Sequence, residues 1–260
     1  MLSKNFTLLF CDIRSFTSLS ERYTQQEIAE LLNEYRTETV NVILRCYRGL
    51  VDKFVGDEIM AEFGLPILLS DHAEQACLAA LDIVCSMERW MKEDKQAFDI
   101  QIGIQTGDMP AEYIWSPYRI EFTVIGDEVT RGLRLMSANK IYQTKNHIII
   151  SEATKNELSD KIVTRELDTV RFEGLTKSDV IFEVVGENDI VIYSEEFLAH
   201  YKQGLACYKK REWDKAIEKF NRALFLTEDN VSNMYIERCN YFKEYPPPSD
   251  WDGVDMFLTK

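Results

Sequence analysis

Residues 5–20, NFTLLFCDIRSFTSLS, form the stretch that decides the fold. The unbroken apolar run from Phe6 to Phe10 predicts a buried strand, and Asp12 falls where that strand should end. The residues that follow Asp12 are short and polar enough to begin a helix. A carboxylate followed at once by backbone N–H groups can hold a metal-bound polyphosphate, because the carboxylate binds the cation and the N–H groups bind the anion. The alternative is that Asp12 only caps a helix.

A second stretch, residues 50–63 (LVDKFVGDEIMAEF), adds to this pattern. Two apolar runs flank Gly56-Asp57, which is typical of a hairpin turn. A hairpin paired beside the first strand would bring Asp57 close to Asp12. Two carboxylates there could bind two divalent cations and hold the attacking and leaving oxygens of a phosphoryl displacement. The alternative for Asp57 is a turn former without further role.

Four segments occur in order along the chain: FCDIRSFTSLSE, DKFVGDEIMAEFG, IGIQTGD and FTVIGDEVTRGLRL. Each resembles a signature segment of class III nucleotide cyclase catalytic domains, and the resemblance extends from about residue 5 to residue 185. It implies an α+β fold, a ferredoxin-like βαββαβ-type core with one mixed sheet, working as a head-to-tail dimer. It also implies an adenylate cyclase that converts ATP to 3′,5′-cyclic AMP and pyrophosphate with two Mg²⁺ or Mn²⁺ ions per site.

By motif position, Asp12 and Asp57 match the two metal-binding carboxylates, and Ile13 would add its backbone carbonyl. The following residues would surround the phosphates; they are Ser15, Phe16 and Thr17.

Lys53 and Thr123 match the positions that contact the purine in this family. Lysine with threonine resembles ATP-selective members, whereas guanylate-specific relatives carry a glutamate and a cysteine or similar residue. A donor can meet adenine N1 but not the N1–H of guanine. Arg134, seven residues after Asp127, matches the arginine that stabilises charge on the α-phosphate, although Arg131 lies close by in the sequence.

Two departures from the family pattern bear on activity. Thr130 stands where the family has an asparagine that positions the ribose, and a misplacement of about 1 Å can cost about a hundredfold in rate. Glu112-Tyr113-Ile114-Trp115 replaces a small Gly-Asn-x-Gly segment near the expected subunit interface. The dimer could therefore differ, or the chain could pair with another cyclase chain. Lys177 is a weaker match to a lysine that binds the distal phosphates.

Two other functions stay open at this point. A catalytically weakened cyclase domain could act as a nucleotide-binding regulatory module, and a guanylate cyclase would use GTP in place of ATP.

Composition limits the partners. The 260 residues carry a net charge of −14, which disfavours nucleic acid and acidic membrane surfaces. No apolar run approaches the roughly 20 residues that span a bilayer, and the first residues do not resemble a signal peptide. We expect a cytoplasmic chain, with an upstream sensor domain left open. Six cysteines without metal-type spacing predict reduced, buried thiols.

Periodicity predicts three longer helices over residues 25–48, 71–91 and 126–139, the first preceded by a capping box at Thr24 and Glu27. It also predicts a shorter helix from residue 152. Strands are expected over residues 98–107, 114–125 and 147–150, with a final pair over residues 163–185 broken at Gly174.

A boundary is predicted at residues 186–189, which divides the chain into a cyclase domain (residues 1–186) and a helical extension (residues 187–260). The extension has two short amphipathic helices joined near Arg211-Glu212, and it resembles a tetratricopeptide repeat. One repeat cannot bury its own apolar face, so the extension should dock on the cyclase domain, on a dimer mate or on another protein. A stiff tail with three prolines and Trp251 is expected to pack along a surface.

Overall fold

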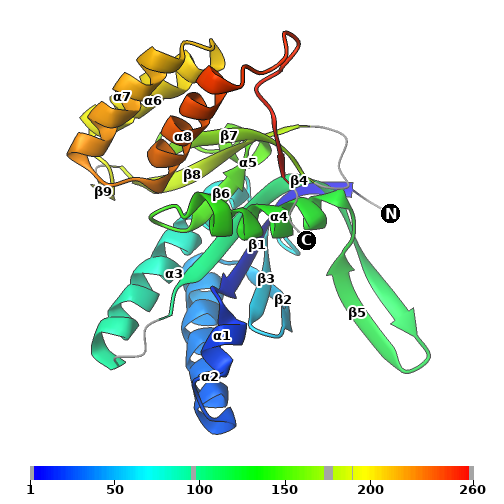
Figure 1. Ribbon diagram of the computed structural model, residues 1–260. Helices are drawn as coiled ribbons and strands as arrows, with labels where there is room; N and C mark the ends of the chain where they lie inside the picture. The colour runs from blue at the N-terminus through cyan, green and yellow to red at the C-terminus, as the bar shows by residue number, and fades with distance from the viewer. Residues whose placement is uncertain (1–2, 95–97, 173–177, 189, 258–260) are drawn as a thin grey trace.

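Ten strands form one mixed sheet in the part of the chain that the computed structural model describes, residues 3–94, 98–172, 178–188 and 190–257 (Figure 1). The strand order is β10-β7-β8-β6-β4-β1-β3-β2, with β5 paired to β4 and β9 to β8. The β4–β6 and β10–β7 pairs are parallel and the others are antiparallel. The strands are β1 (Ser3–Ile13), β2 (Leu50–Val55), β3 (Glu58–Phe63), β4 (Ile100–Ser116), β5 (Arg119–Val124), β6 (Ile148–Ser151), β7 (Ile162–Phe172), β8 (Asp179–Glu187), β9 (Ile190–Val191) and β10 (Asp255–Phe257).

Helices cover both faces of this sheet, and three more helices follow it. A π-helical turn over residues 42–46 extends α2. The helices are α1 (Phe16–Ser20), α2 (Gln25–Asn41), α3 (His72–Asp94), α4 (Asp127–Tyr142), α5 (Glu152–Asn156), α6 (Glu195–Lys209), α7 (Trp213–Leu226) and α8 (Asn230–Glu244).

The central strand β1 packs on both sides, as its continuous apolar run predicts. Leu9, Cys11 and Ile13 belong to the core beneath α2 and α3. Phe6, Leu8 and Phe10 belong to the core on the opposite face; that core also contains Met136 of α4. The alternation of side chains along β1 therefore fixes which helix lies on which face.

Two glycines let α4 lie close on the sheet. A Cβ on Gly103 of β4 would lie 2.3 Å from the backbone nitrogen of Met136. A Cβ on Gly132 of α4 would lie 2.3 Å from the ring of Phe10. Because neither position has room for a side chain, the backbone of α4 is held at a short distance from β1 and β4.

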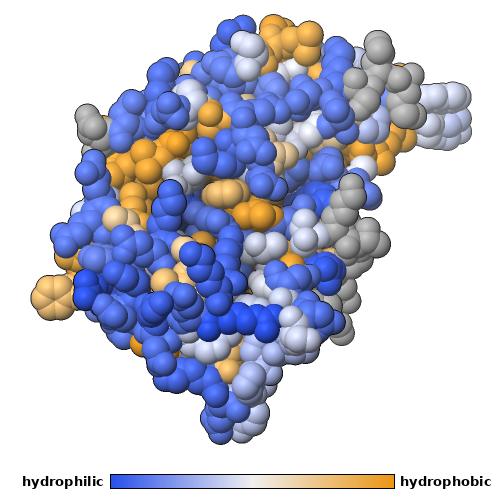
Figure 2. Space-filling view, turned by 90° about the horizontal axis from the view of Figure 1, so that it is seen from above, coloured by the Kyte–Doolittle hydropathy of each residue, from blue (hydrophilic) through white to orange (hydrophobic). Residues whose placement is uncertain are grey.

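Helices α6, α7 and α8 pack on the end of the sheet that β7 and β8 form (Figure 1). One apolar core joins residues of α4, such as Leu135 and Tyr142, with residues of these three helices, such as Phe220 and Tyr235. Seen from above, the face that these helices present to solvent is largely hydrophilic, with smaller hydrophobic areas between (Figure 2). The C-terminal helices thus bury their apolar sides against the rest of this chain.

The α+β class, the mixed sheet and the TPR-like helices are as the sequence predicts. The capping box at Thr24 and Glu27 forms with both of its hydrogen bonds. Three details were predicted wrongly. The strand expected to end at Gly107 continues to Ser116. The extension, predicted with two helices, has a third helix, α8. All six cysteines are free thiols, but Cys46 and Cys85 are exposed and not buried. Gly174 lies outside the described residues.

Candidate active site

Asp12 and Asp57 lie side by side at the end of β1. The Gln101 side chain, opposite Asp12 in the β1–β4 register, donates a hydrogen bond of 3.1 Å to the Asp12 carboxylate. Burial, followed by contact with the neighbouring Asp57 carboxyl group, raises the pKa of Asp12 to about 7. Two adjoining carboxyl groups in a partly buried position attract a cation, since ionising both without one is unfavourable.

The β2–β3 hairpin sets the position of Asp57. Gly56 has φ +63°, the left-handed conformation that a tight turn needs at this point. From α2, the Arg36 guanidinium donates a hydrogen bond to the Gly56 carbonyl, and it also lies 4.7 Å above the centre of the Phe54 ring. A residue outside the sequence motifs thereby holds the turn that carries Asp57.

The two aspartates open into a polar cavity of about 510 Å³. Gln101 and Lys140 line it together with Ile13, Arg14 and the residues predicted to surround the phosphates, Ser15, Phe16 and Thr17. The Arg14 N–H donates to the Asp99 carbonyl at 2.7 Å, so this group is not available to a phosphate. The side chain of Ile13 is buried in the core, so only its backbone is available to a metal.

Lys53 and Thr123 are brought together although 70 residues separate them. The Lys53 ammonium donates to the Thr123 hydroxyl at 2.8 Å, and the hydroxyl donates to Asp52 at 3.2 Å. Lys53 Nζ also lies 3.5 Å from the Asp52 carboxylate. The predicted purine-contacting pair is therefore preformed, and Asp52 is its third member.

Thr130 and Arg134 both lie on α4, Thr130 exposed and Arg134 half-buried. The neighbouring Arg131 forms an ion pair with Asp179 and lies 3.7 Å from Glu128. Because Arg131 already contacts these two carboxylates, it is a poorer candidate than Arg134 for the arginine that stabilises charge on the α-phosphate. The Lys177 position lies outside the described residues.

The predicted site residues divide into separate groups within one chain. The cavity at Asp12 and Asp57 is lined neither by Lys53 and Thr123 nor by Thr130 and Arg134. Asp12 lies beside Asp57 and Lys53 beside Thr123, while the roles of these residues stay predictions. Sequence reasoning could not find Gln101, Lys140 or Arg36, because their roles depend on strand register and on contacts between helix and turn that no local pattern reveals.

The segment from Glu112 to Trp115 lies in the long ribbon of β4 and β5, which projects from the body of the molecule (Figure 1). Its large side chains are exposed: Tyr113 by 69%, Ile114 by 50% and Trp115 by 74%. Tyr118 and Ile120 of the same ribbon are exposed as well, and exposed apolar side chains gathered on one element mark a surface for interaction.

No cluster of three or more histidine, cysteine, aspartate or glutamate ligands occurs among residues 3–94, 98–172, 178–188 and 190–257. The metal ligands that the cavity offers include the carboxylates of Asp12 and Asp57 and backbone carbonyl oxygen. These are the hard oxygen ligands that Mg²⁺ and Mn²⁺ prefer. Mg²⁺ in particular is bound by one or two carboxylates together with substrate phosphates. The residues present therefore fit a phosphate-bridged divalent ion. In addition, none of the described helices is long and apolar enough to cross a membrane.

Comparison with known proteins agrees with this arrangement. Residues 2–186 match the family described as the adenylate and guanylate cyclase catalytic domain, and residues 197–230 match the tetratricopeptide repeat. The chain is 28% identical over 246 residues to the terminal-differentiation-specific adenylate cyclase of Dictyostelium discoideum, covering 92% of this chain and 11% of that protein. It is 29% identical to adenylate cyclase 1 of Rhizobium meliloti, covering 69% of this chain and 27% of that protein.

The crystal structure of the adenylyl cyclase CyaB from P. aeruginosa is similar with a TM-score of 0.65 and 30% identity, covering 72% of this chain and 96% of that chain. The chain spans only 11% and 27% of the two curated relatives, so their likeness concerns one part of longer proteins. The family match, by contrast, includes strands β1 to β8, both aspartates and helix α4. The chain belongs to the adenylate and guanylate cyclase catalytic domain family.

Proposed function

We propose that this chain is an adenylate cyclase that converts ATP to 3′,5′-cyclic AMP and pyrophosphate at a dimer interface. The observation that carries the proposal is the adjoining pair of Asp12 and Asp57, in which burial, followed by contact with the Asp57 carboxyl group, raises the pKa of Asp12 to about 7. A structural role explains such a pair poorly, because two carboxyl groups that share a partly buried site destabilise it unless a cation neutralises them.

Asp12 and Asp57 would hold two Mg²⁺ or Mn²⁺ ions, with the Ile13 carbonyl as a further ligand. When bound, such ions supply acidification of the ribose 3′-hydroxyl and neutralisation of the triphosphate charge. The chain's own contribution is positional. The segment from Ser15 to Thr17 forms the cavity wall along which the phosphates would lie.

The remaining groups would come from the partner subunit. Lys53 and Thr123 read the purine, Arg134 faces the charge that develops on the α-phosphate, and Thr130 orients the ribose. Two observations support a dimer: these residues do not line the cavity of their own chain, and the β4–β5 ribbon exposes Trp115 and Tyr118. A homodimer is the simplest assembly, and a heterodimer with another cyclase chain would fulfil the same geometry.

We propose ATP as the substrate because a lysine, Lys53, stands at the predicted purine position. Its hydrogen bond to Thr123 and its proximity to Asp52 fix a donor there, and a donor suits adenine N1. Exchanging both residues for the pair of guanylate-specific relatives (Lys53→Glu with Thr123→Cys) should shift the ratio of kcat/KM for ATP over GTP by at least tenfold toward GTP. An unchanged ratio would remove Lys53 and Thr123 from the purine site.

The test of activity is direct. The purified chain is incubated with ATP or GTP and with Mn²⁺ or Mg²⁺, and both cyclic nucleotide and pyrophosphate are measured. We expect cyclic AMP and pyrophosphate in equal amounts, and their loss in Asp57→Asn, which keeps the size of the side chain and removes its charge. Cyclic GMP as the main product would instead establish a guanylate cyclase.

A second candidate function, a nucleotide-binding regulatory module, is favoured by Thr130 in place of the family's asparagine. ATP binding without product, in the presence of either metal, would support it. The C-terminal helices would then serve the partner that the module regulates. For either function we propose a cytoplasmic site of action, with an upstream sensor domain as the source of the signal.

A further inference from the structure

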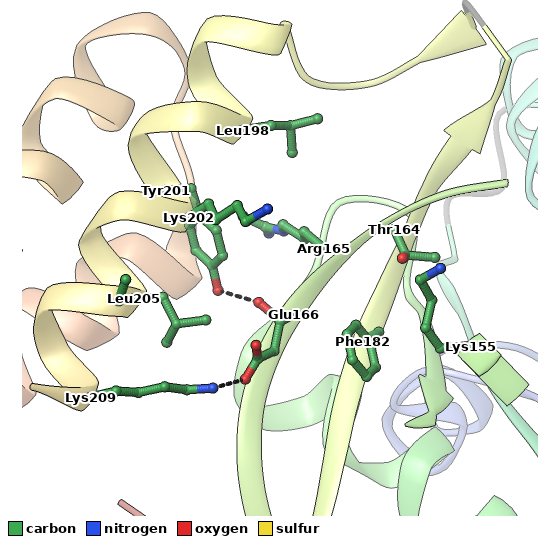
Figure 3. A pocket seen from close by; sticks show the side chains of 11 residues that line it. Lys155, Thr164, Arg165, Glu166, Phe182, Leu198, Tyr201, Lys202, Leu205 and Lys209 are labelled. Carbon is green, nitrogen blue, oxygen red and sulfur yellow. Dashed lines mark hydrogen bonds and ion pairs between the residues drawn. The ribbon is translucent and has the colours of Figure 1, made fainter. Parts of the chain in front are cut away.

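A pocket of about 390 Å³ lies between α6 and strands β7 and β8 (Figure 3). None of the residues that line it also lines the aspartate cavity. This volume lies within the roughly 300–1,000 Å³ of pockets that bind small ligands. Apolar side chains line it from both sides. Leu198, Leu205 and the Tyr201 ring come from α6, and Phe182 comes from β8.

Lysines stand around this apolar lining. Lys202 reaches from α6 toward the strands, and Lys155 of α5 stands beside Thr164 on the opposite side (Figure 3). Neither ammonium group forms an ion pair with a carboxylate in the described part of the chain. A third lysine, Lys209, is paired with Glu166. The pocket therefore carries a local positive charge although the whole chain has a net charge of −14.

The other cation at the pocket is already committed. Arg165 is 4% exposed, and its guanidinium bonds Glu183, both oxygens of Asp229 and the Tyr193 hydroxyl. It therefore serves the packing between β7 and the C-terminal helices. Only Lys155 and Lys202 remain to receive a negative charge.

We propose that this pocket binds a small amphipathic carboxylate, such as a medium-chain fatty acid. The apolar lining takes the hydrocarbon chain, and the ammonium groups of Lys155 and Lys202 take the carboxylate at the mouth. A nucleotide or a sugar fits this lining poorly, since both would place polar groups against leucine and phenylalanine without hydrogen-bonding partners. A metal ion is disfavoured by the positive charge.

The position of the pocket gives binding a consequence. Its two sides belong to different parts of the chain, α6 on one side and β7, β8 and α5 on the other. A ligand that contacts both sides binds only the folded, docked state and stabilises it by mass action. At a concentration one hundred times the dissociation constant, this linkage is worth about 2.7 kcal/mol.

Calorimetric titration of the full chain with dodecanoate, below its micelle concentration, tests the proposal. Dodecylammonium has the same chain and the opposite charge, and it serves as the ligand control. We expect one dodecanoate site per chain, no comparable site for dodecylammonium, and an upward shift of the melting temperature with dodecanoate alone. The double variant Lys155→Ala with Lys202→Ala should weaken dodecanoate binding at least tenfold.

Two further variants separate the pocket from general surface effects. Ala206→Trp places an indole in the pocket mouth without removing a charge, and it should abolish dodecanoate binding. Lys210→Ala removes an exposed lysine at the end of the same helix, outside the pocket, and it should leave binding unchanged. The proposal is overturned if dodecanoate does not bind, if dodecylammonium binds equally well, or if the lysine variants bind as the native chain does. None of these outcomes depends on cyclase activity.

Discussion

Among single residues, Glu62 of β3 has an unusual environment. Its side chain is fully buried, and neither carboxylate oxygen has a hydrogen-bond partner. Burial, followed by repulsion from Asp52, raises its pKa to about 7, and nearby Lys53 opposes this rise. In the folded chain the Glu62 carboxyl group therefore stays protonated at pH values well above 4.5, its usual pKa.

This pKa predicts how stability changes with pH. Between about pH 4.5 and pH 7 the folded state binds the Glu62 proton more tightly than the unfolded state, so the contribution of Glu62 to stability is lost as pH rises through this window. At about 1.4 kcal/mol per pH unit, the loss is of the order of 3 kcal/mol. Urea unfolding at pH 5 and pH 8 should show Glu62→Gln gaining stability relative to the native chain at pH 8. The exposed Glu34→Gln is the matched control, and a shift equal to that of the control would contradict the assignment.

Thr130 is the residue at which the chain departs from its family within the proposed site. Threonine is shorter than asparagine and lacks the amide, so ribose orientation should be looser. Because Thr130 is exposed at the start of α4, Thr130→Asn should fold normally. We expect its kcat to rise about tenfold or more, within the roughly hundredfold cost of a 1 Å misplacement. A kcat at or below the native value would show that the threonine is adapted to this site.

Residue pairs within the site were predictable where a motif fixed their spacing. Asp12 and Asp57 follow apolar runs that end at the same edge of the sheet, and pairing of the two strands brings them together. Gln101 and Arg36 were not predictable, since the first depends on the β1–β4 register and the second on a contact between α2 and a turn. The alternation of residues around Gln101 shows only that a strand is present, not which residue lies opposite.

Among the helices, α4 links the proposed catalytic residues to the C-terminal helices. It carries Thr130 and Arg134 on one part of its surface, and Gly132 lets it approach Phe10 of β1. Leu135 and Tyr142, farther along, pack in the core shared with the C-terminal helices. The position of the proposed catalytic residues on α4 therefore depends on packing along its whole length.

Gly132→Ala tests this dependence. The added Cβ would lie 2.3 Å from the Phe10 ring, so α4 or the ring must move. We expect kcat with ATP to fall at least tenfold, because displacement of reacting groups by about 1 Å is costly. Binding of Mn²⁺ at Asp12 and Asp57 should remain within a few-fold of native. Ser137→Ala, on the same helix, is the control, and equal kcat values for the two variants would show that the approach of α4 is not limiting.

The elements that sequence predicted well are those with strong local signals. The hairpin around Gly56 and the capping box of α2 formed as expected. Helix α8 was not predicted because polar residues interrupt its apolar ones, and because the prolines that follow it are typical of an irregular tail. The continuation of β4 beyond Gly107 was missed because glycine and proline within it resemble a strand end, whereas pairing with β5 sustains the strand to Ser116.

For the molecule as a whole, the question is whether the C-terminal helices are a separate unit. Their apolar core is shared with β7, β8 and α4, and several polar contacts join them to β7, among them the following three. The Tyr201 hydroxyl donates to the Glu166 carbonyl at 2.9 Å, the Tyr235 hydroxyl to the Leu167 carbonyl at 2.6 Å, and Arg238 to Asp168 at 2.6 Å. The domain boundary at residues 186–189 stays a prediction. One apolar core contains residues from both sides of it.

Arg165 is the centre of that junction, and replacing it tests whether the chain unfolds as one unit. Arg165→Met leaves Glu183 and Asp229 buried without their cation, which should cost about 3–5 kcal/mol. Arg222→Met removes an exposed pair with Glu218, and it should cost less than about 1 kcal/mol. In urea, the native chain should show one transition by circular dichroism and by tryptophan fluorescence, and Arg165→Met should lower its midpoint without splitting it. Two separate transitions, with the helices melting first in Arg165→Met, would instead show that the catalytic domain keeps its fold after the C-terminal helices detach.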